Sequence, residues 1–544
     1  MAPRHNNRLN VLIVGAGPTG LALALQLQAL GVPFRIIDRQ LDRARESRAL
    51  AVQPRTLELL RTVGVADELV ERGNDAVKLQ MHVGARVARL RLFDIGLEDT
   101  AYPFLLFVSQ AVTEEVMNDR LVAADVKVER GMELVAISPG DEEAACTLQR
   151  QDGETERVRA SYLVGCDGAH STVRDLAGIP FEGAAYPQTF ALADLDVDGG
   201  LDSETVHAFL RPTGMLLFFP LEHPAPWRMI AMGPRAVARA GEEPRAPSLE
   251  DLQRITDAYT PNLRLRDPVW LSYFRIHHRQ AVSYRRGRVF VAGDAAHVHS
   301  PAGAQGMNTG IQDSWNLGWK LALVTKDVTD QTLLDSYEAE RLPIGRFVVR
   351  FTDRAFLVAT STNRLVRLIR LQVVPRLAPL LLRVKRGRAA AFRTVAQLGL
   401  NYRQSTIVEE GEPPLRRGPK AGDRLPDLRL VQDGEEIWLY EVLDPARFHL
   451  LLCGPPDEWE AVRIANLRER YEHVVVVHWM AREGGPGVLL DKAGLALRRL
   501  GIERLGLYLV RPDGYVAYRS AGESPAGLEC YLRRWIRCPD QPKA

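Results

Sequence analysis

The sequence predicts an α/β protein built from three parts, and three observations lead to this prediction. A strand–turn–helix–strand pattern opens the chain, a strand-rich stretch punctuated by Pro and Gly begins near residue 180, and a second α/β pattern follows a polar segment near residue 410. At 544 residues the chain far exceeds one average domain of roughly 150 residues. We expect residues 1–180 and 275–400 to form one discontinuous domain around an inserted sheet, 181–274, with a linker and a third domain at 401–544.

The N-terminal segment carries a dinucleotide-binding fingerprint. An apolar strand is followed by Gly15, Gly17 and Gly20 in G-x-G-x-x-G spacing and then by an Ala/Leu-rich helix. This spacing allows a tight turn, a close approach of the backbone to a pyrophosphate, and close packing of the helix on the strand. Asp38 ends the next strand, where a carboxylate accepts hydrogen bonds from a ribose. An Asp here favours FAD or NAD over NADP, although Arg39 lies beside it.

Two later segments also place polar residues after an apolar strand. Asp167–Gly168 follows the strand YLVGC and precedes a short predicted helix, and Gly293–Asp294 follows the strand RVFVA. The next loop contains Pro301 and Gly303 and enters a helix that we predict to begin at about Gly306. A Gly-rich loop of this kind exposes backbone N–H groups at the positive end of a helix.

Composition excludes several classes of protein. With 70 Lys and Arg against 68 Asp and Glu, the net charge of +2 provides no broad field for nucleic acid. Five scattered cysteines indicate neither a disulfide framework nor a metal site, so we expect no metal and a reducing, cytoplasmic location. The N-terminus leaves no room for a signal peptide, and no apolar run reaches the roughly 20 residues of a membrane span.

The glycine fingerprint, the Asp167–Gly168 segment and the Gly293–Asp294 segment occur in the order found in the class A flavoprotein aromatic hydroxylases, the family of para-hydroxybenzoate hydroxylase and phenol hydroxylase. The chain resembles this family over nearly its whole length, and most of all its longer members. The resemblance implies an α/β fold with a Rossmann-like FAD-binding domain, an inserted mixed β-sheet substrate domain and a C-terminal thioredoxin-like domain. It also implies FAD as cofactor, NADPH or NADH as a transient reductant, and O2 and a small aromatic molecule as substrates.

The same resemblance assigns roles to individual residues. Asp294 would bind the ribityl chain of FAD, and Asp167 and Gly168 would lie where the nicotinamide cofactor passes the FAD pyrophosphate. The loop that contains Pro301 and Gly303 would stabilise negative charge on the pyrimidine edge of the reduced flavin. The full expected cofactor site also includes Gly15, Gly17, Gly20, Asp38, Arg39, Arg48, Gln110, Gly293, Gly306, Met307 and Asn308.

The expected activity is a monooxygenase reaction on a phenolic or polycyclic aromatic molecule through a C4a-hydroperoxyflavin. A single dinucleotide fingerprint suffices, because in the resembling family the nicotinamide cofactor binds only transiently. The lack of a C-x-x-C or C-x4-C pair argues against a disulfide reductase, and the lack of W-x-W-x-I-P argues against a tryptophan-type halogenase. A Baeyer–Villiger or N-hydroxylating monooxygenase on the same scaffold, or a redox-silent flavin or ligand carrier, stays open as an alternative.

The substrate side is less well defined by the sequence. The resemblance places the substrate between the inserted sheet and the flavin, and Leu50 stands where phenol hydroxylase carries a substrate-facing Asp. Titratable residues that could replace this Asp are His207, Tyr273, His277 and His278, although such residues on strands are more often structural. The sequence therefore assigns no catalytic base.

Two segments of the C-terminal half need separate interpretation. Cys453 lies in C-G-P-P, where an active thioredoxin has C-G-P-C, so we expect a structural or interfacial domain without thiol exchange. The segment LVRLIRLQVVPRLAPLLLRVKRGR is apolar and Arg-rich. It fits helices packed at a domain or homodimer contact better than a membrane surface, although both interpretations stay open.

Overall fold

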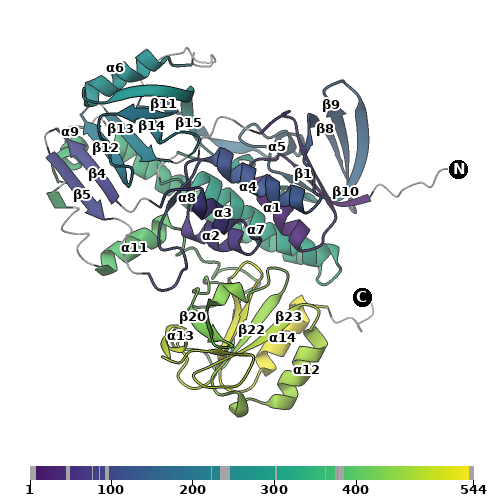
Figure 1. Ribbon diagram of the computed structural model, residues 1–544. Helices are drawn as coiled ribbons and strands as arrows, with labels where there is room; N and C mark the ends of the chain where they lie inside the picture. The colour runs from purple at the N-terminus through teal and green to yellow at the C-terminus, as the bar shows by residue number, and fades with distance from the viewer. Residues whose placement is uncertain are drawn as a thin grey trace.

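The computed structural model describes residues 8–43, 49–75, 78–84, 86–91, 97–212, 214–221, 223–232, 246–300, 303–361, 363–373, 376–377 and 385–537. In these residues three large sheets and the helices around them form an α/β fold with mixed sheets (Figure 1). Two predicted site residues, Arg48 and Pro301, lie outside the described residues.

The first sheet collects strands from distant parts of the chain. Its order is β16-β17-β10-β1-β2-β7, with β9 on β10 and β8 on β9. Neighbouring strands from β17 to β7 are parallel. The inner strands are apolar and buried, as expected for parallel strands covered on both faces. The strands are β1 (Arg8–Val14), β2 (Phe34–Asp38), β7 (Glu129–Arg130), β8 (Met132–Pro139), β9 (Ala144–Arg150), β10 (Thr155–Gly165), β16 (Arg285–Arg286) and β17 (Val289–Val291).

Helix α1 (Pro18–Ala29) crosses this sheet and packs against α4 (Gln110–Ala123) and α7 (Gly306–Thr325). Pro18 starts α1 because its fixed φ suits the first helical position, and Gly31 leaves the helix with φ +62°. The predicted helix start at Gly306 and strand end at Asp38 are confirmed. Other helices are α2 (Pro54–Arg61), α3 (Ala66–Glu71), α5 (Thr172–Leu176), α8 (Asp335–Thr360), α9 (Arg364–Leu368), the π-helix (Ile369–Val373) and α11 (Lys385–Val395).

The second sheet stands beside the first and has the order β18-β15-β11-β14-β13-β12-β4-β5. Helix α6 (Leu249–Tyr259) packs on β15 and β12, on the face that we call the outer face. The sheet also takes in β4 and β5, which come from before residue 100. Its strands are β4 (Lys78–Val83), β5 (Arg86–Arg91), β11 (Phe181–Asp198), β12 (Thr205–Arg211), β13 (Gly214–Pro220), β14 (Trp227–Met232), β15 (Arg264–Ala281) and β18 (His297–Val298).

The third sheet belongs to the C-terminal module, drawn in yellow and green below the rest of the chain in Figure 1. Its order is β19-β26-β25-β22-β23-β24-β20-β21, with α12, α13 and α14 beside it. The predicted α/β pattern of this region is present, with strands and helices alternating from β22 to α14. The elements are β19 (Glu409–Glu410), β20 (Arg429–Gln432), β21 (Glu435–Trp438), β22 (Phe448–Cys453), α12 (Ala461–Tyr471), β23 (Val475–Ala481), β24 (Val488–Leu490), α13 (Leu495–Arg499), β25 (Gly506–Val510), β26 (Val516–Ala521) and α14 (Ala526–Trp535).

The segment expected to be a polar linker is instead part of a buried contact. Leu415 is 6% exposed, and the Arg424 guanidinium pairs with Glu58 of α2. A second ion pair joins Arg511 of the module to Glu340 of α8, with Nη1 2.6 Å from Oε1. Residues 424–427 of this segment are therefore buried and Arg424 pairs across the interface, whereas Pro414, Arg416 and Arg417 are exposed. In the described part of the chain, no helix has the length and apolar character needed to cross a bilayer.

Candidate functional site

A cavity of about 240 Å³ lies at the carboxyl ends of β1, β2 and β10. This is the edge at which parallel sheets with helices on both faces bind their ligands. Segments 14–17, 38–42, 110–114, 130–134 and 166–172 line it. The residues from the predicted site that line the cavity are Gly15, Gly17, Asp38, Arg39, Gln110, Asp167 and Gly168.

The three fingerprint glycines differ in what surrounds them. A Cβ on Gly15 would lie 2.4 Å from the Cys166 carbonyl oxygen, and one on Gly20 would lie 1.9 Å from the Gly15 carbonyl oxygen. A Cβ on Gly17 would meet no atom within 4 Å, since this residue faces the cavity. The first and last glycines therefore serve the packing of the chain itself, whereas Gly17 keeps space open before the N-terminus of α1. No side chain caps that N-terminus.

Asp38 is fixed at the rim of the cavity. Its Oδ2 accepts a hydrogen bond from the Ala16 backbone N–H at 2.7 Å, and its Oδ1 accepts one from the Gln40 N–H at 2.8 Å. Arg130 Nη1 lies 3.9 Å from Oδ2, and Arg39 is exposed beside it. The carboxylate thus holds the glycine turn in place while it lines the cavity.

Glu114 is a cavity residue that the sequence analysis missed. It is 2% exposed, and its Oε1 accepts a hydrogen bond from Gln110 Nε2 at 2.8 Å. Burial raises the pKa of Glu114 to about 7, against the lowering effect of the Gln110 hydrogen bond. Its position four residues after Gln110 on α4 was the available signal, because residues at this spacing share a helix face.

The Asp167 carboxylate is directed into its own chain. It accepts hydrogen bonds from the Ser171 hydroxyl and from the Val173 N–H at 3.1 Å, and burial raises its pKa. Arg174 of α5 donates to the Ala169 carbonyl at 3.1 Å and to the Ala295 carbonyl at 3.2 Å. This arginine therefore ties the Asp167–Gly168 segment to the Gly293–Asp294 segment.

The Gly293–Asp294 segment rests on a buried ion pair. The Gly293 N–H donates to Asp313 Oδ2 at 3.1 Å, Arg341 Nε donates to Asp313 Oδ1 at 2.6 Å, and His297 Nε2 lies 2.7 Å from Oδ2. Burial would raise the pKa of Asp313, but Arg341 and His297 hold it below its ordinary value. Asp294 itself is exposed between buried neighbours. The network thus positions the backbone from which Asp294 projects.

Helix α7 packs against the Gly293–Asp294 segment. Gly306 and Met307 form its first turn, which no side chain caps. Asn308 accepts from the Gln53 N–H at 2.9 Å and donates to the Ala51 carbonyl at 2.8 Å and to the Ala304 carbonyl at 2.9 Å. Asn308 therefore fixes residues 303–305, which we call the loop before α7, against residues 51–53. The loop reaches its shape with positive φ angles at Gly303 (+80°) and Ala304 (+52°).

His299 is a second residue that the sequence analysis missed. A Cβ on Gly306 would lie 3.7 Å from His299 Nε2, and this ring nitrogen is buried without a hydrogen-bond partner among the described residues. Burial lowers the pKa of His299 to about 4, so the ring is neutral at pH 7. A neutral ring nitrogen at this point can donate or accept one hydrogen bond next to the first turn of α7.

An apolar cluster lies between the second sheet and the loop before α7. It includes Leu50, Tyr186, Phe190 and Phe356, and Ala304 of the loop packs against it. We call the sheet face that carries Tyr186 and Phe190 the inner face. Within this face a buried ion pair joins Arg228 to Asp194, and Arg228 Nη1 donates to the Ala49 carbonyl at 2.6 Å. The inner face is thereby anchored to the same segment that Asn308 holds.

The four titratable residues considered as a base lie on different faces. Tyr273 packs with the outer cluster near α6. His207 stacks near His82, with its Nδ1 3.2 Å from His82 Nε2, on the face that carries Phe209 of the outer cluster. His278 contacts Tyr186 with ring centroids 4.8 Å apart, and His277 alternates to the opposite side of β15.

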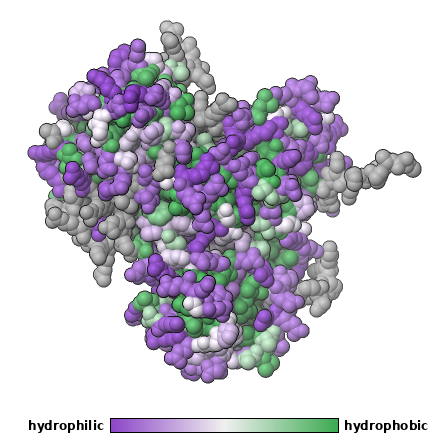
Figure 2. Space-filling model, in the orientation of Figure 1, coloured by the Kyte–Doolittle hydropathy of each residue, from purple (hydrophilic) through white to green (hydrophobic). Residues whose placement is uncertain are grey.

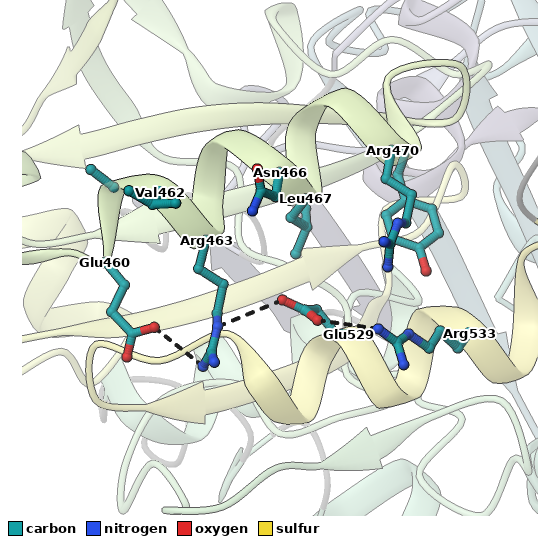
Figure 3. A pocket seen from close by; sticks show the side chains of 10 residues that line it. Glu460, Val462, Arg463, Asn466, Leu467, Arg470, Glu529 and Arg533 are labelled. Atoms are coloured by element: carbon teal, nitrogen blue, oxygen red, sulfur yellow. Dashed lines mark ion pairs between the residues drawn. The ribbon is translucent and has the colours of Figure 1, made fainter.

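The C-terminal module contains larger hollows that none of the predicted cofactor residues line. One, of about 600 Å³, lies between α12 and α14, where Arg463 contacts Glu460 and Glu529 (Figure 3). Another, of about 800 Å³, follows Cys453 and is lined by Gly454 and Pro455. The Cys453 side chain is fully buried, and burial raises its pKa to about 12.

Comparison with known proteins identifies two family matches. The FAD binding domain family matches residues 8–352, and the aromatic-ring hydroxylase C-terminal family matches residues 418–539. The 6-methylpretetramide 4-monooxygenase of Streptomyces rimosus is 36% identical, over 97% of this chain and 94% of that protein. The matches extend over the cofactor cavity, the second sheet and the C-terminal module.

Solved structures agree with these matches. The anhydrotetracycline hydroxylase OxyS from Streptomyces rimosus is 30% identical, with a TM-score of 0.75 over 97% of this chain and 99% of that one. A ternary complex of aklavinone-11 hydroxylase with FAD and aklavinone is 26% identical, with a TM-score of 0.76 over 98% of this chain and 99% of that one.

Proposed function

Because the chain belongs to the family of FAD-dependent aromatic-ring monooxygenases, we propose that it hydroxylates a polycyclic or phenolic aromatic molecule, with NAD(P)H as reductant. The relatives named above act on, or bind, polycyclic aromatic compounds, which favours a fused-ring substrate. In this proposal the first sheet is a Rossmann-like FAD-binding domain, the second sheet forms the substrate domain, and the C-terminal module is thioredoxin-like.

The residues of the cavity fit a dinucleotide. Gly17 leaves open space before the uncapped N-terminus of α1, which favours the negative charge of a pyrophosphate. Asp38, at the end of β2, can accept hydrogen bonds from a ribose, and the exposed Asp294 can accept hydrogen bonds from the ribityl chain. The uncapped first turn of α7, at Gly306 and Met307, stabilises negative charge on the flavin ring. When bound, FAD supplies hydride uptake from the nicotinamide and the activation of O2.

The observation that carries the substrate proposal is the contact between the apolar cluster and the loop before α7. A large aromatic molecule bound among Tyr186, Phe190 and Phe356 would lie next to that loop, among residues that do not line the polar cavity. Apolar walls there exclude water from the reacting carbon, and the Arg228–Asp194 ion pair holds the sheet against residues 49–53. The C-terminal module, with its single buried thiol, has a structural role in this proposal.

The decisive experiment is a substrate panel of fused-ring aromatics and monocyclic phenols. We expect NAD(P)H oxidation to accelerate with fused-ring compounds and the product to gain one oxygen atom from 18O2, measured by mass spectrometry. Equal rates across the panel, with only hydrogen peroxide formed, would refute hydroxylation of these compounds. Oxygen inserted beside a ketone or on nitrogen would refute the aromatic proposal specifically.

A paired variant tests the cofactor assignment. Asp294→Ala should weaken FAD binding by about 1–3 kcal/mol through loss of an acceptor to a buried sugar hydroxyl. Asp457→Ala is the matched control, because Asp457 is also an exposed Asp in a short 3-10 helix but lies in the C-terminal module. Fluorescence titration of the apoprotein with FAD gives both affinities. Identical affinities for the two variants would remove Asp294 from the site.

A further inference from the structure

One region of the surface is both apolar and basic. It runs along the second half of α8 and through α9 into the π-helix, residues 346–373, and we call it the basic apolar surface. Its large exposed apolar side chains are Phe347 (48%), Leu357 (52%), Val358 (55%), Leu365 (64%), Leu368 (54%), Ile369 (42%) and Val373 (39%). In the described part of the chain, α9 has no buried residue. Helix α9 therefore makes no buried domain contact among the described residues, and the homodimer contact expected from the sequence stays a prediction.

The charge of this surface departs from that of the whole chain. Residues 346–373 contain six Arg and one acidic residue, Asp353, in a protein whose charges otherwise balance. The Tyr186 hydroxyl donates to the Asp353 carboxylate, which is therefore engaged toward the apolar cluster. In the described residues, no carboxylate forms an ion pair with Arg346, Arg350 or Arg354, which recur every four residues along α8.

The arginines and aromatic rings of α8 alternate around a shallow hollow of about 400 Å³. Arg346, Arg350 and Arg354 line it together with Phe347 and Phe351, whose rings are stacked with centroids 5.9 Å apart. Figure 2 shows one face of the molecule, on which hydrophobic groups lie among hydrophilic ones. Unpaired arginines beside exposed Phe, Leu and Val are the composition of helices that lie in a membrane interface.

We propose that the basic apolar surface docks on an anionic lipid bilayer, with the leucines and phenylalanine in the acyl boundary and the arginines at the headgroups. Charge decides against two other occupants. A two-fold contact with a second copy would bring these arginine rows against each other without carboxylates to neutralise them. Nucleic acid would pair with the arginines but would leave the exposed aliphatic side chains without apolar partners.

The basic apolar surface lies next to the proposed substrate side of the second sheet. Phe356 is buried in the apolar cluster beside the loop before α7, while the next two residues, Leu357 and Val358, are exposed. The same turn of α8 therefore borders the proposed substrate side and the proposed bilayer contact. The docking proposal itself does not rest on the proposed reaction, because it concerns binding to lipid and is measured without turnover.

The test is co-sedimentation of the FAD-loaded full-length protein with vesicles. One set contains phosphatidylcholine with about 30% phosphatidylglycerol, and the other contains phosphatidylcholine alone. We expect binding to the anionic set, weaker binding to the neutral set, and a loss of binding in about 0.5 M salt, where surface charges are screened. No binding to anionic vesicles, or equal binding to both sets, would overturn the proposal.

Two pairs of substitutions separate the two components of the surface. Arg354→Glu with Arg364→Glu should raise the half-saturating lipid concentration about 10-fold or more, since each basic residue contributes about 1 kcal/mol near an anionic surface. Leu365→Ser with Leu368→Ser should weaken binding by a similar factor through lost apolar insertion. The matched control is Arg470→Glu with Val462→Ser, at a basic and a 77% exposed apolar residue on α12 (Figure 3).

Folding of each variant is checked by its FAD content and thermal midpoint. This check is needed because Arg354 lies on α8, which also borders the apolar cluster, and Arg364, Leu365 and Leu368 lie on α9, which follows α8. Vesicle binding that survives either substitution pair in a folded protein would overturn the proposal. So would a concentration-dependent dimer, seen by analytical ultracentrifugation, that both pairs abolish while vesicle binding is absent.

Discussion

The contrast between Gly17 and Gly20 yields a prediction that separates cofactor binding from folding. Each glycine is replaced by Ala in a separate variant, so each variant gains one methyl group at a different place in the same turn. At Gly17 the φ of −76° suits any residue, and the new Cβ meets no protein atom within 4 Å. At Gly20 the new Cβ would lie 1.9 Å from the Gly15 carbonyl oxygen, against an ordinary contact of about 3.5 Å.

The magnitudes follow from these distances. Gly20→Ala forces α1 away from β1 and should lower the free energy of unfolding of the apoprotein by about 1–3 kcal/mol or more. Gly17→Ala should lower the stability of the apoprotein by about 0.5–1 kcal/mol, the preference for Gly over Ala at an N-cap. Its methyl group instead occupies the space in front of α1. Loss of one charge-assisted hydrogen bond, about 1.5–3 kcal/mol, should then weaken FAD binding about 10- to 100-fold.

The assay uses apoprotein prepared from each variant. Thermal unfolding without FAD gives the stability, and quenching of FAD fluorescence gives the affinity. The reasoning fails if Gly17→Ala retains wild-type affinity for FAD, or if apo Gly20→Ala is as stable as the wild type. If Gly17→Ala lost both the stability of the apoprotein and the affinity for FAD, the open space at Gly17 would serve folding and not the cofactor.

Three further predictions concern buried groups. Arg341→Met should lower the free energy of unfolding by about 3–5 kcal/mol, because Asp313 stays buried without its guanidinium partner. Thermal unfolding measures this effect, with Arg350→Met at an exposed arginine as the control, and equal midpoints for the two variants would contradict the prediction. The pKa of Glu114, about 7 in the folded state, lies above its usual value, so the apoprotein should lose stability as pH rises from about 5 to 8. Glu114→Gln should flatten that dependence and be more stable than the wild type at pH 8 by about 1–3 kcal/mol, whereas parallel pH curves would exclude Glu114 as the cause. Cys453→Ser should leave substrate-dependent NAD(P)H oxidation unchanged, because a buried thiol with a pKa of about 12 is not a thiolate near pH 7. Loss of flavin reduction in a folded, FAD-loaded variant would contradict this prediction.

The parts of the site that the sequence predicted are those whose physics is local. The G-x-G-x-x-G turn, Asp38 at a strand end and Gly306 at a helix start each depend on neighbours within a few residues, and the fold has them in those places. The family resemblance added the Gly293–Asp294 segment. Each of these signals can be read along a single strand–turn–helix unit.

The parts that the sequence did not predict depend on long-range pairs. Arg341 reaches Asp313 across 28 residues, and Arg228 reaches the Ala49 carbonyl across 179 residues. A charged residue in a sequence is more often at the surface, so nothing local marks these as buried. The same holds for the polar segment near residue 415, where Arg424 pairs with Glu58 in a buried interface instead of a free linker.

The cavity at the ends of β1, β2 and β10 and the inner face of the second sheet are lined by different kinds of residue. The cavity is lined by the glycine turn and by many polar and charged side chains, whereas the inner face of the second sheet carries apolar side chains such as Phe190 and Phe274. A substitution on that face reshapes the apolar cluster and removes none of the hydrogen bonds that hold Asp38 or Asn308. If the inner face binds the substrate, as proposed, substrate preference can diverge through single codon changes there while the cavity residues stay unchanged. A library restricted to the inner-face positions would then be the direct route to new hydroxylation products.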